Sequence, residues 1–390
     1  MLPLKNFLYS PGPTQIPPEV LLEMAHPILH HRTPQFSAIL DQARERMKPL
    51  MGTRQEVILL AASGTGGMEA AVVNVLAPGE AALFVNGGKF GERWGKLLSA
   101  FGMKGHELKV EWGRAVEPEQ IERALGEHPE IRAVLIQASE TSTCALHPVA
   151  EIAAITRKRD VMLLVDGITS VGVFAQEMDA WGVDVMVTGS QKALMLPPGL
   201  AMVALSPRAW EKAKGNRTRG YYFDLFRERK AQVDEHTTAY TPAVSLICGL
   251  NKSLELIERE TLDAVFERHR VMAEATRAAA AAIGLKLLAP DHPAPGVTGL
   301  LVPESINSSK VVRYMRDTLG VVAQGGQDHM SGKLLRIGHM GYVTPLEILI
   351  AVGAMEMGLA REGYRFELGR AVAAAQTRIA QTQVRTAAAA

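Results

Sequence analysis

The sequence predicts an α/β fold with a large domain, built on a mostly parallel sheet, and a smaller α+β domain. Between residues 56 and 206, short apolar runs alternate with stretches whose apolar residues recur at helical spacing. Such runs are typical of parallel strands that helices cover on both faces. Beyond residue 260, long helical stretches dominate. We therefore expect an arm over residues 1–18, a large domain over 19–260 and a small domain over 261–390.

The elements of the large domain follow the arm in order. Apolar residues at helical spacing predict helical structure over 18–31 and 36–51. Strands and helices then alternate. The predicted strands are 56–62, 81–87, 131–139, 161–167, 184–190 and 201–206, and the predicted helices are 64–76, 91–102 and 147–160.

The small domain is predicted from a second series of patterns. A long helix is expected over 258–284, with alternating polar and small apolar positions. A strand, a helix, a strand and a helix then follow at 297–303, 308–320, 334–341 and 344–363. This order suits a compact α+β unit joined to the large domain.

The composition excludes several classes of function. The formal net charge is +1, with 47% hydrophobic and 21% charged residues, so the charge predicts no nucleic-acid partner. The two cysteines, Cys144 and Cys248, lie far apart and in no zinc-ligand spacing, so we expect neither a disulfide framework nor a metal site. No signal peptide and no apolar run of about 18 residues is present, which predicts a cytoplasmic protein without a membrane partner.

A glycine-rich stretch, "SGTGGMEAAV", follows the first strand and opens a helix. Exposed N–H groups and the helix dipole make such a turn a natural anion site, to which Ser63 and Thr65 add hydroxyl groups. The stretch matches neither the dinucleotide-binding fingerprint nor the phosphate loop of nucleotide hydrolases. A purely structural tight turn is the alternative reading.

Two charged residues follow strands of the same predicted sheet. Asp166 ends the run that begins at Val161, and Lys192 comes just after the run that ends at Ser190. Alone, the aspartate could cap a turn and the lysine could be an ordinary surface residue. Parallel strands, however, place both side chains at one edge, beside the glycine-rich turn. An anion cradle, a carboxylate and a lysine are the groups that pyridoxal 5′-phosphate requires for its phosphate, its pyridine nitrogen and its Schiff base.

These stretches resemble the class V (fold type I) aminotransferases, and especially the alanine:glyoxylate and serine:glyoxylate group. The resemblance covers nearly the whole chain in the family's order. It is carried by "SPGPTQIPPEV", "HHRTPQF", "SGTGGMEAAV", "NGGKFGERW", "ASETSTC", "LLVDGITSVG", "TGSQKALMLPPG", "YTPAVSLI" and "LLRIGHMG". It implies a fold type I architecture whose large domain holds a seven-stranded sheet.

The resemblance also implies roles for individual residues. Lys192 would form the Schiff base, and Asp166 would pair with the pyridine nitrogen. The remaining cofactor-binding residues it implies are Thr65, Gly66, Gly67 and Gln191 around the phosphate, Phe90 and Ile168 on the two ring faces, and Thr141 at the ring hydroxyl.

Further implied roles concern the substrate and a second subunit. Arg336, with Gly12, would bind the substrate, because a guanidinium group matches a carboxylate bidentately. Thr241 would reach the phosphate of the neighbouring subunit, which implies a homodimer with shared active sites. Either Thr238 or Tyr240 would assist there.

The activity expected from the resemblance is ping-pong transamination. An amino group would move from a small amino acid, alanine or serine, to a small 2-oxo acid, glyoxylate or pyruvate. No second basic group for a distal acidic group is evident, although Arg32 or Arg219 could line the pocket. His30 and His31 are read as structural or as lining of the substrate channel.

Two alternatives stay open at this point. One is another class V enzyme, such as a 2-aminoethylphosphonate or phosphoserine transaminase, a lyase or a desulfurase. A desulfurase needs a loop cysteine, which the stretch 321–338 lacks, and Cys144 reads as a small buried residue. The other alternative is a non-catalytic subunit that retains the fold, as in relatives labelled hydrogenase subunits.

Overall fold

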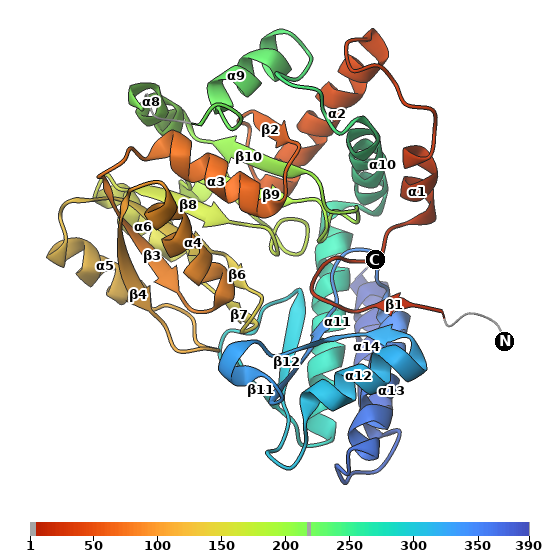
Figure 1. Cartoon of the computed structure of the whole chain (residues 1–390). Helices are drawn as coiled ribbons and strands as arrows, with labels where there is room; N and C mark the ends of the chain where they lie inside the picture. Colours follow the sequence, from red (N-terminus) through yellow and green to blue (C-terminus); the bar gives the residue numbers. More distant parts are fainter. Residues whose placement is uncertain (1–4, 217–219, 390) are drawn as a thin grey trace.

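A seven-stranded sheet forms the centre of the computed structural model, which describes residues 5–216 and 220–389 (Figure 1). Strand β10 is antiparallel to both of its neighbours and all other neighbouring pairs are parallel. Across the sheet the strands are β2 (Val57–Leu60), β10 (Ala201–Leu205), β9 (Val185–Gly189), β8 (Met162–Asp166), β5 (Ile131–Gln137), β3 (Ala81–Asn86) and β4 (Lys104–Lys109). The expected fold class is confirmed.

Strand β4 is the one strand of this sheet that the apolar pattern did not predict. Its sequence, KGHELK, carries three charged residues. It is an edge strand, whose residues are exposed or half-buried, so it needs no continuous apolar run. The other six strands lie where short apolar runs predicted them.

Helices cover both faces of this sheet. Along β9 and β10 the side chains alternate: Met186 and Met202 pack on one face, and Val187 and Val203 on the other. The first face is covered mainly by α2 (Pro34–Met51), α5 (Pro118–Glu127), α6 (Val149–Lys158) and α10 (Val244–Glu260), and the second by α3 (Gly64–Val75), α4 (Lys89–Ala100) and α8 (Pro207–Gly215). Shorter helices are α7 (Met178–Trp181) and α9 (Leu225–Arg229), which continues as a π-helical turn over Lys230–Asp234.

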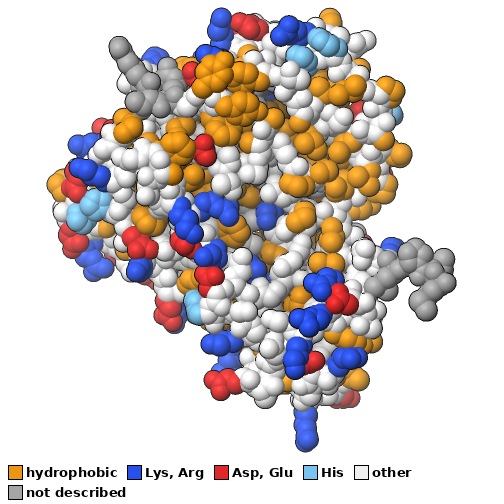
Figure 2. Space-filling view, in the orientation of Figure 1, with side chains coloured by type: hydrophobic (Ala, Val, Ile, Leu, Met, Phe, Trp, Pro, Cys, Tyr) orange, Lys and Arg blue, Asp and Glu red, His pale blue; other side chains and the backbone are white. Residues whose placement is uncertain are grey.

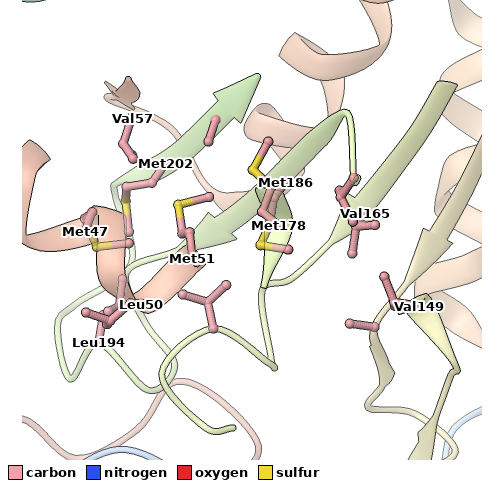
Figure 3. Close-up of a cluster of buried hydrophobic side chains, with 14 of the residues drawn as sticks. Met47, Leu50, Met51, Val57, Val149, Val165, Met178, Met186, Leu194 and Met202 are labelled. Carbon is pink, nitrogen blue, oxygen red and sulfur yellow. The ribbon is translucent and has the colours of Figure 1, made fainter. Parts of the chain in front are cut away.

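Methionines fill much of the core between α2 and the sheet, as Figure 3 shows. Their unbranched, polarisable side chains adapt to the irregular space between a helix and a twisted sheet. The labelled methionines come from three kinds of element: Met47 and Met51 from α2, Met186 and Met202 from the sheet, and Met178 from α7. All five are buried, so this layer fixes α2 against the strands.

A second, four-stranded sheet carries the C-terminal part of the chain. Its order is β11 (Lys286–Leu287), β12 (Val297–Leu301), β15 (Leu334–Gly338) and β14 (Gln324–Gly325). The helices of this part are α11 (Leu262–Ala282), α12 (Ser308–Leu319), α13 (Pro345–Arg361) and α14 (Arg370–Ala389). The expected strand, helix, strand, helix order is present, and the domain boundaries at residues 18 and 260 stay predictions.

The N-terminal arm lies against this second part before it reaches the first. Strand β1 (Phe7–Leu8) pairs in parallel with β13 (Val321–Val322), and Tyr9 is fully buried. The Gly338 N–H donates to the Tyr9 carbonyl at 2.6 Å. The chain then runs to the segment after β9, where Thr14 Oγ1 donates to the Lys192 carbonyl at 2.7 Å.

Two helix predictions were wrong in their extent. The helical stretch expected over 18–31 ends early, because α1 covers only Pro18–Met24 and Pro27 disfavours helical geometry at the residue before it. The long helix expected over 258–284 is broken at Thr261, whose φ is +69°. Thr261 ends α10 and caps α11 through its hydroxyl. Within the described residues, no helix has the length and apolar character that crossing a membrane requires.

Candidate active site

The carboxyl ends of five strands meet around one cavity. The parallel orientation of β2, β3, β5, β8 and β9 brings the segments that follow them to the same edge of the sheet. The cavity is lined by Ser63, Gly64, Thr65, Phe90, Arg93, Ser139, Thr141, Asp166, Ile168, Thr169, Gln191 and Lys192. Seven of the residues predicted for a cofactor site are among them: Thr65, Phe90, Thr141, Asp166, Ile168, Gln191 and Lys192.

The first turn of α3 forms one wall of this cavity. The first N–H groups of a helix have no acceptor within the helix, and the Ser63 side chain makes no capping bond to them. A Cβ on Gly64 would collide with the Ile168 side chain, so the backbone passes close to the cavity there. This turn therefore presents N–H groups and the positive end of a helix dipole to an anion.

The other two glycines of the turn face elsewhere. A Cβ on Gly66 would lie 2.7 Å from Ala62 Cβ, and one on Gly67 would lie 2.6 Å from Val187 Cγ1. The Gly67 N–H already donates to the Ser63 carbonyl at 3.1 Å. Gly67 thus allows α3 to approach β9 closely, and its predicted contact with a cofactor stays a prediction.

Asp166 is the last residue of β8 and is buried, with 5% of its surface exposed. Its Oδ1 accepts a hydrogen bond from the Ile168 N–H at 2.9 Å. Burial raises the pKa of this carboxyl to about 6, and the bond from Ile168 opposes the rise. A carboxylate held in such a place favours a cationic partner in the cavity.

Lys192 extends into the cavity from the segment after β9. Its amine donates to the carbonyl of Pro11, and a Cβ on Gly12 would collide with that amine. Gly12 has φ of +115°, a conformation in which only glycine is unstrained. Burial lowers the pKa of Lys192 to about 8; Asp166 opposes this shift, and Arg336 and Arg93 add to it. A neutral amine, the form that attacks a carbonyl, is therefore more accessible than for an exposed lysine.

Arg336 reaches the cavity wall from the second sheet. It lies on β15 and is 5% exposed. Its Nη1 donates to the Thr141 carbonyl at 2.9 Å, and its Nε donates to the Gly325 carbonyl at 3.0 Å. Burial lowers the pKa of this guanidinium from its usual value. Both sheets thus supply charged groups to this region, and the substrate-binding role that the resemblance implied for Arg336 stays a prediction.

Other predicted residues lie outside this cavity in the single chain. Thr241, Thr238 and Tyr240 line a separate depression beside β2 and α10. His30 and His31 stack on each other, with ring centroids 4.8 Å apart, and do not line the cavity. Arg32 is exposed, and Arg219 lies outside the described residues.

Cys144 is buried, with 2% of its surface exposed. Burial raises the pKa of its thiol to about 12, against the opposing effect of Arg336. A thiol in this environment stays protonated near neutral pH and is a poor nucleophile. The position therefore fits a small buried side chain.

Sequence reasoning missed Arg93, which lines the cavity. It is three residues after Phe90 on α4, so both side chains lie on one helix face. Its Nη1 donates to Thr65 Oγ1 at 3.0 Å, and its guanidinium carbon lies 4.9 Å from the centre of the Phe90 ring. Helical spacing within the stretch "GKFGERW" was the signal that could have found it.

Sequence reasoning also missed Glu140, a fully buried carboxylate behind the cavity wall. Its Oε2 accepts from the N–H groups of Phe90 and Gly91 at 3.1 and 2.9 Å and from Gln137 Nε2 at 2.7 Å. Its Oε1 accepts from the N–H and the hydroxyl of Ser142. Glu140 therefore fixes the first turn of α4, and with it Phe90, against the end of β5.

We expect Glu140→Gln to destabilise the protein by about 2 to 3 kcal/mol, because an amide NH₂ would face donors where a carboxylate oxygen now accepts their bonds. The shift in the denaturant midpoint measures this loss. Glu92→Gln is the matched control, since Glu92 lies on α4, the helix that Glu140 holds, and forms half-exposed pairs with Lys89 and Lys96. It should change stability by less than about 0.5 kcal/mol. Equal effects of the two variants would contradict the role given to Glu140.

The described residues fit pyridoxal 5′-phosphate. Ser139 Oγ and Gln191 Oε1, both in residues that line the cavity, are buried polar atoms without a hydrogen-bond partner in the described chain. Such atoms are rare unless a ligand or water satisfies them. Together with the α3 turn for an anion, Asp166 for a cationic ring nitrogen and Lys192 for a carbonyl carbon, they supply a partner for each end of the cofactor.

Comparison with known proteins identifies the family. The model of the aminotransferase class-V family matches residues 6–346. The L-aspartate–glyoxylate aminotransferase of Paracoccus denitrificans is 38% identical over 388 residues, which cover 97% of each chain. The small subunit of a soluble hydrogenase from Synechococcus sp. is 38% identical over 375 residues, covering 95% of this chain and 97% of that one.

Solved structures agree with this assignment. The ureidoglycine–glyoxylate aminotransferase of Bacillus subtilis superposes with a TM-score of 0.92 at 27% identity, covering 97% of this chain and 98% of that one. The family and the fold imply dependence on pyridoxal phosphate. With a family match over most of its length and a named aminotransferase relative along nearly all of it, this chain belongs to the class V aminotransferases.

Proposed function

We propose that this protein transfers an amino group from alanine or serine to glyoxylate or pyruvate by a ping-pong mechanism. The observation that carries the proposal is the convergence of three charged groups on one cavity. Asp166 and Lys192 line it, and Arg336 bonds to its wall at Thr141. A lysine that anchors the cofactor, a carboxylate and a carboxylate-binding guanidinium are the groups that transamination needs.

Each residue has a task in this reaction. Pyridoxal phosphate, held by the α3 turn, Gln191 and Lys192, supplies an acceptor for the electrons released when a bond to the substrate α-carbon breaks. Lys192 would anchor the cofactor, and its free amine would carry a proton away from the substrate α-carbon. Asp166 keeps the ring nitrogen protonated. Arg336 orients the carboxylate that both substrates share, so that one site serves two substrates in turn.

The cations around the cavity favour small substrates. Among the described residues that line the cavity, the cationic side chains are those of Arg93 and Lys192. Arg93 already bonds to Thr65 and packs on Phe90, at the end of the cavity assigned to the cofactor. A donor with a second carboxylate would compete with these partners for Arg93. Aspartate is nevertheless a second candidate donor, because a relative with 38% identity is named for it.

We further propose a homodimer with shared active sites. Thr241 is exposed and lies away from the Lys192 cavity of its own chain, which suits a role in the site of a neighbouring subunit. Large apolar side chains are exposed in α1, just after it and before α9, namely Leu21, Leu22, Ile28, Tyr221 and Tyr222. Figure 2 shows hydrophobic side chains gathered over α1 and α10 on one side of the molecule. Such a patch is typical of an interface.

Three alternatives fit the chain less well. A non-catalytic role, suggested by the hydrogenase-subunit name of a relative, leaves the perturbed pair Asp166 and Lys192 unexplained. A desulfurase lacks its nucleophile, because the segment 321–338 contains no cysteine. A phosphorylated donor would need a second anion cradle.

The two free cysteines are consistent with the cytoplasmic location that the sequence predicted.

The test is a donor panel with the cofactor-loaded protein. Alanine or serine alone should convert the cofactor to its amine form and release pyruvate or hydroxypyruvate, respectively. With glyoxylate added as acceptor and both donors at the same concentration, each donor should turn over and yield glycine. We expect aspartate to react at least roughly 10-fold more slowly, because about 1.4 kcal/mol is lost if Arg93 gives up the Thr65 bond. Faster reaction of aspartate would replace the small-donor assignment, and no change with any amino donor would reject transamination.

A further inference from the structure

A second group of metal-binding side chains lies outside the active-site cavity. His106, His128 and Glu130 each offer one ligand atom, and no two of these atoms are more than 4.8 Å apart. None of the three lines the Lys192 cavity. The sequence predicted no metal site, because the usual spaced cysteine and histidine motifs are absent.

The fold brings these residues together from three places. His106 lies on edge strand β4 opposite Leu83 of β3, and, like Leu108 two residues on, it points to the sheet face that α5 covers. His128 is the C-terminal cap of α5, where its N–H donates to the Ala124 carbonyl at 3.0 Å. Glu130 directly precedes β5, and the Ile131 N–H donates a hydrogen bond to the His128 carbonyl at 3.1 Å. One residue of a strand and two residues of a hydrogen-bonded turn thus supply the three ligand atoms.

The distances between ligand atoms fit a small divalent ion. His106 Nε2 lies 3.2 Å and His128 Nδ1 lies 3.5 Å from the same oxygen of Glu130, Oε1. A four-coordinate zinc ion, with bonds of about 2.0 to 2.2 Å, separates neighbouring ligand atoms by roughly 3.3 to 3.5 Å. Both separations are close to that range, and all three ligand atoms lie within 4.8 Å of one another. The centroids of the two imidazole rings are 4.3 Å apart.

The chemistry of the three side chains selects the ion. Two imidazoles and one carboxylate suit zinc and the other late first-row divalent metals, whereas magnesium and calcium prefer all-oxygen sites. His106 and His128 are half-buried, and Glu130 is exposed. Three protein ligands leave a fourth position of a tetrahedral site open to water on that exposed side.

We propose that His106, His128 and Glu130 form a zinc-binding site at the edge of the large sheet, independent of the transaminase reaction. A bound ion would tie β4 to the turn between α5 and β5. Because the edge strand lacks a partner on one side, it gains most from such a link. The metal would therefore stabilise the folded chain by an amount that grows with the logarithm of its concentration relative to its dissociation constant.

The experiment titrates Zn²⁺ into the cofactor-loaded, tag-free protein after treatment with a chelator. We expect one tightly bound ion per chain and a rise in the thermal midpoint. His128→Ala and Glu130→Gln should each weaken binding at least roughly 100-fold and abolish the rise, since even the loss of a group behind a metal ligand costs up to about that factor. Transaminase activity should not change in either variant.

His26→Ala is the matched control. His26 pairs with Glu23 at 3.7 Å, so it is another surface imidazole beside a carboxylate but without the third ligand. It should leave zinc binding unchanged. If the three residues make ion pairs only, zinc will bind no more tightly to the wild type than to His128→Ala. If zinc binds to surface histidines in general, the number of bound ions will fall equally in His26→Ala. Either result would overturn the proposal.

Discussion

Lys192→Ala should give a folded protein that has lost both the covalent cofactor and at least roughly 1000-fold in turnover. The loss is large because one amine serves as anchor and as proton carrier, and general acid–base catalysis alone contributes about 100- to 10,000-fold. Folding should survive, since alanine fits the space and the amine's hydrogen bond goes to one carbonyl, that of Pro11. Removing a buried amine also removes its desolvation cost.

The measurement is the absorbance spectrum of the protein with added pyridoxal phosphate, followed by turnover with alanine and glyoxylate. In the wild type the covalent band should form faster as the pH rises towards 8, because the pKa of Lys192 is about 8 and the neutral amine reacts. Lys109→Ala is the control, as Lys109 is an exposed lysine of edge strand β4. A covalent band in Lys192→Ala, or its loss in Lys109→Ala, would refute the assignment of the anchor.

Much of this site could be predicted because the segments that follow parallel strands lie at the same edge of the sheet, even when they are far apart in the sequence. Asp166 and Lys192 are far apart along the chain, yet each follows a strand whose carboxyl end lies at one edge. Apolar runs mark such strands directly, since both faces of the sheet are buried. The combination of strand ends and residue types was therefore enough to bring these two side chains together.

The features that were missed depend on side chains or backbone without a periodic signature. Strand β4 is an edge strand and carries lysines and a glutamate, so its sequence does not read as a strand. Thr261 interrupts a continuous helical pattern through a single left-handed residue. Glu140 is a charged residue whose burial is possible only because five donors converge on it. Such convergence depends on the tertiary structure, and the local sequence around Glu140 does not indicate it.

The second large effect is expected for Asp166→Asn, which should lower turnover at least roughly 100-fold while leaving the fold intact. A charge-assisted hydrogen bond to the protonated ring nitrogen contributes about 3 kcal/mol, and each 1.36 kcal/mol corresponds to tenfold in rate. Asparagine has the same shape, and its oxygen can still accept the Ile168 N–H bond. The backbone turn after β8 should therefore be preserved.

The cofactor-free protein provides the control for this change. The pKa of Asp166 is raised to about 6 by burial, so its ionised form costs the folded state stability as the pH rises from about 4, and this cost is complete above pH 6. Asparagine carries no such cost, and at pH 7 the cofactor-free variant should unfold at the same or a higher denaturant concentration than the wild type. Asp317→Asn, at an exposed pair with Arg316, should change neither property. Turnover of Asp166→Asn within about threefold of the wild type would exclude a role in holding the ring proton, whereas a lower unfolding midpoint would show that the carboxylate serves the fold instead.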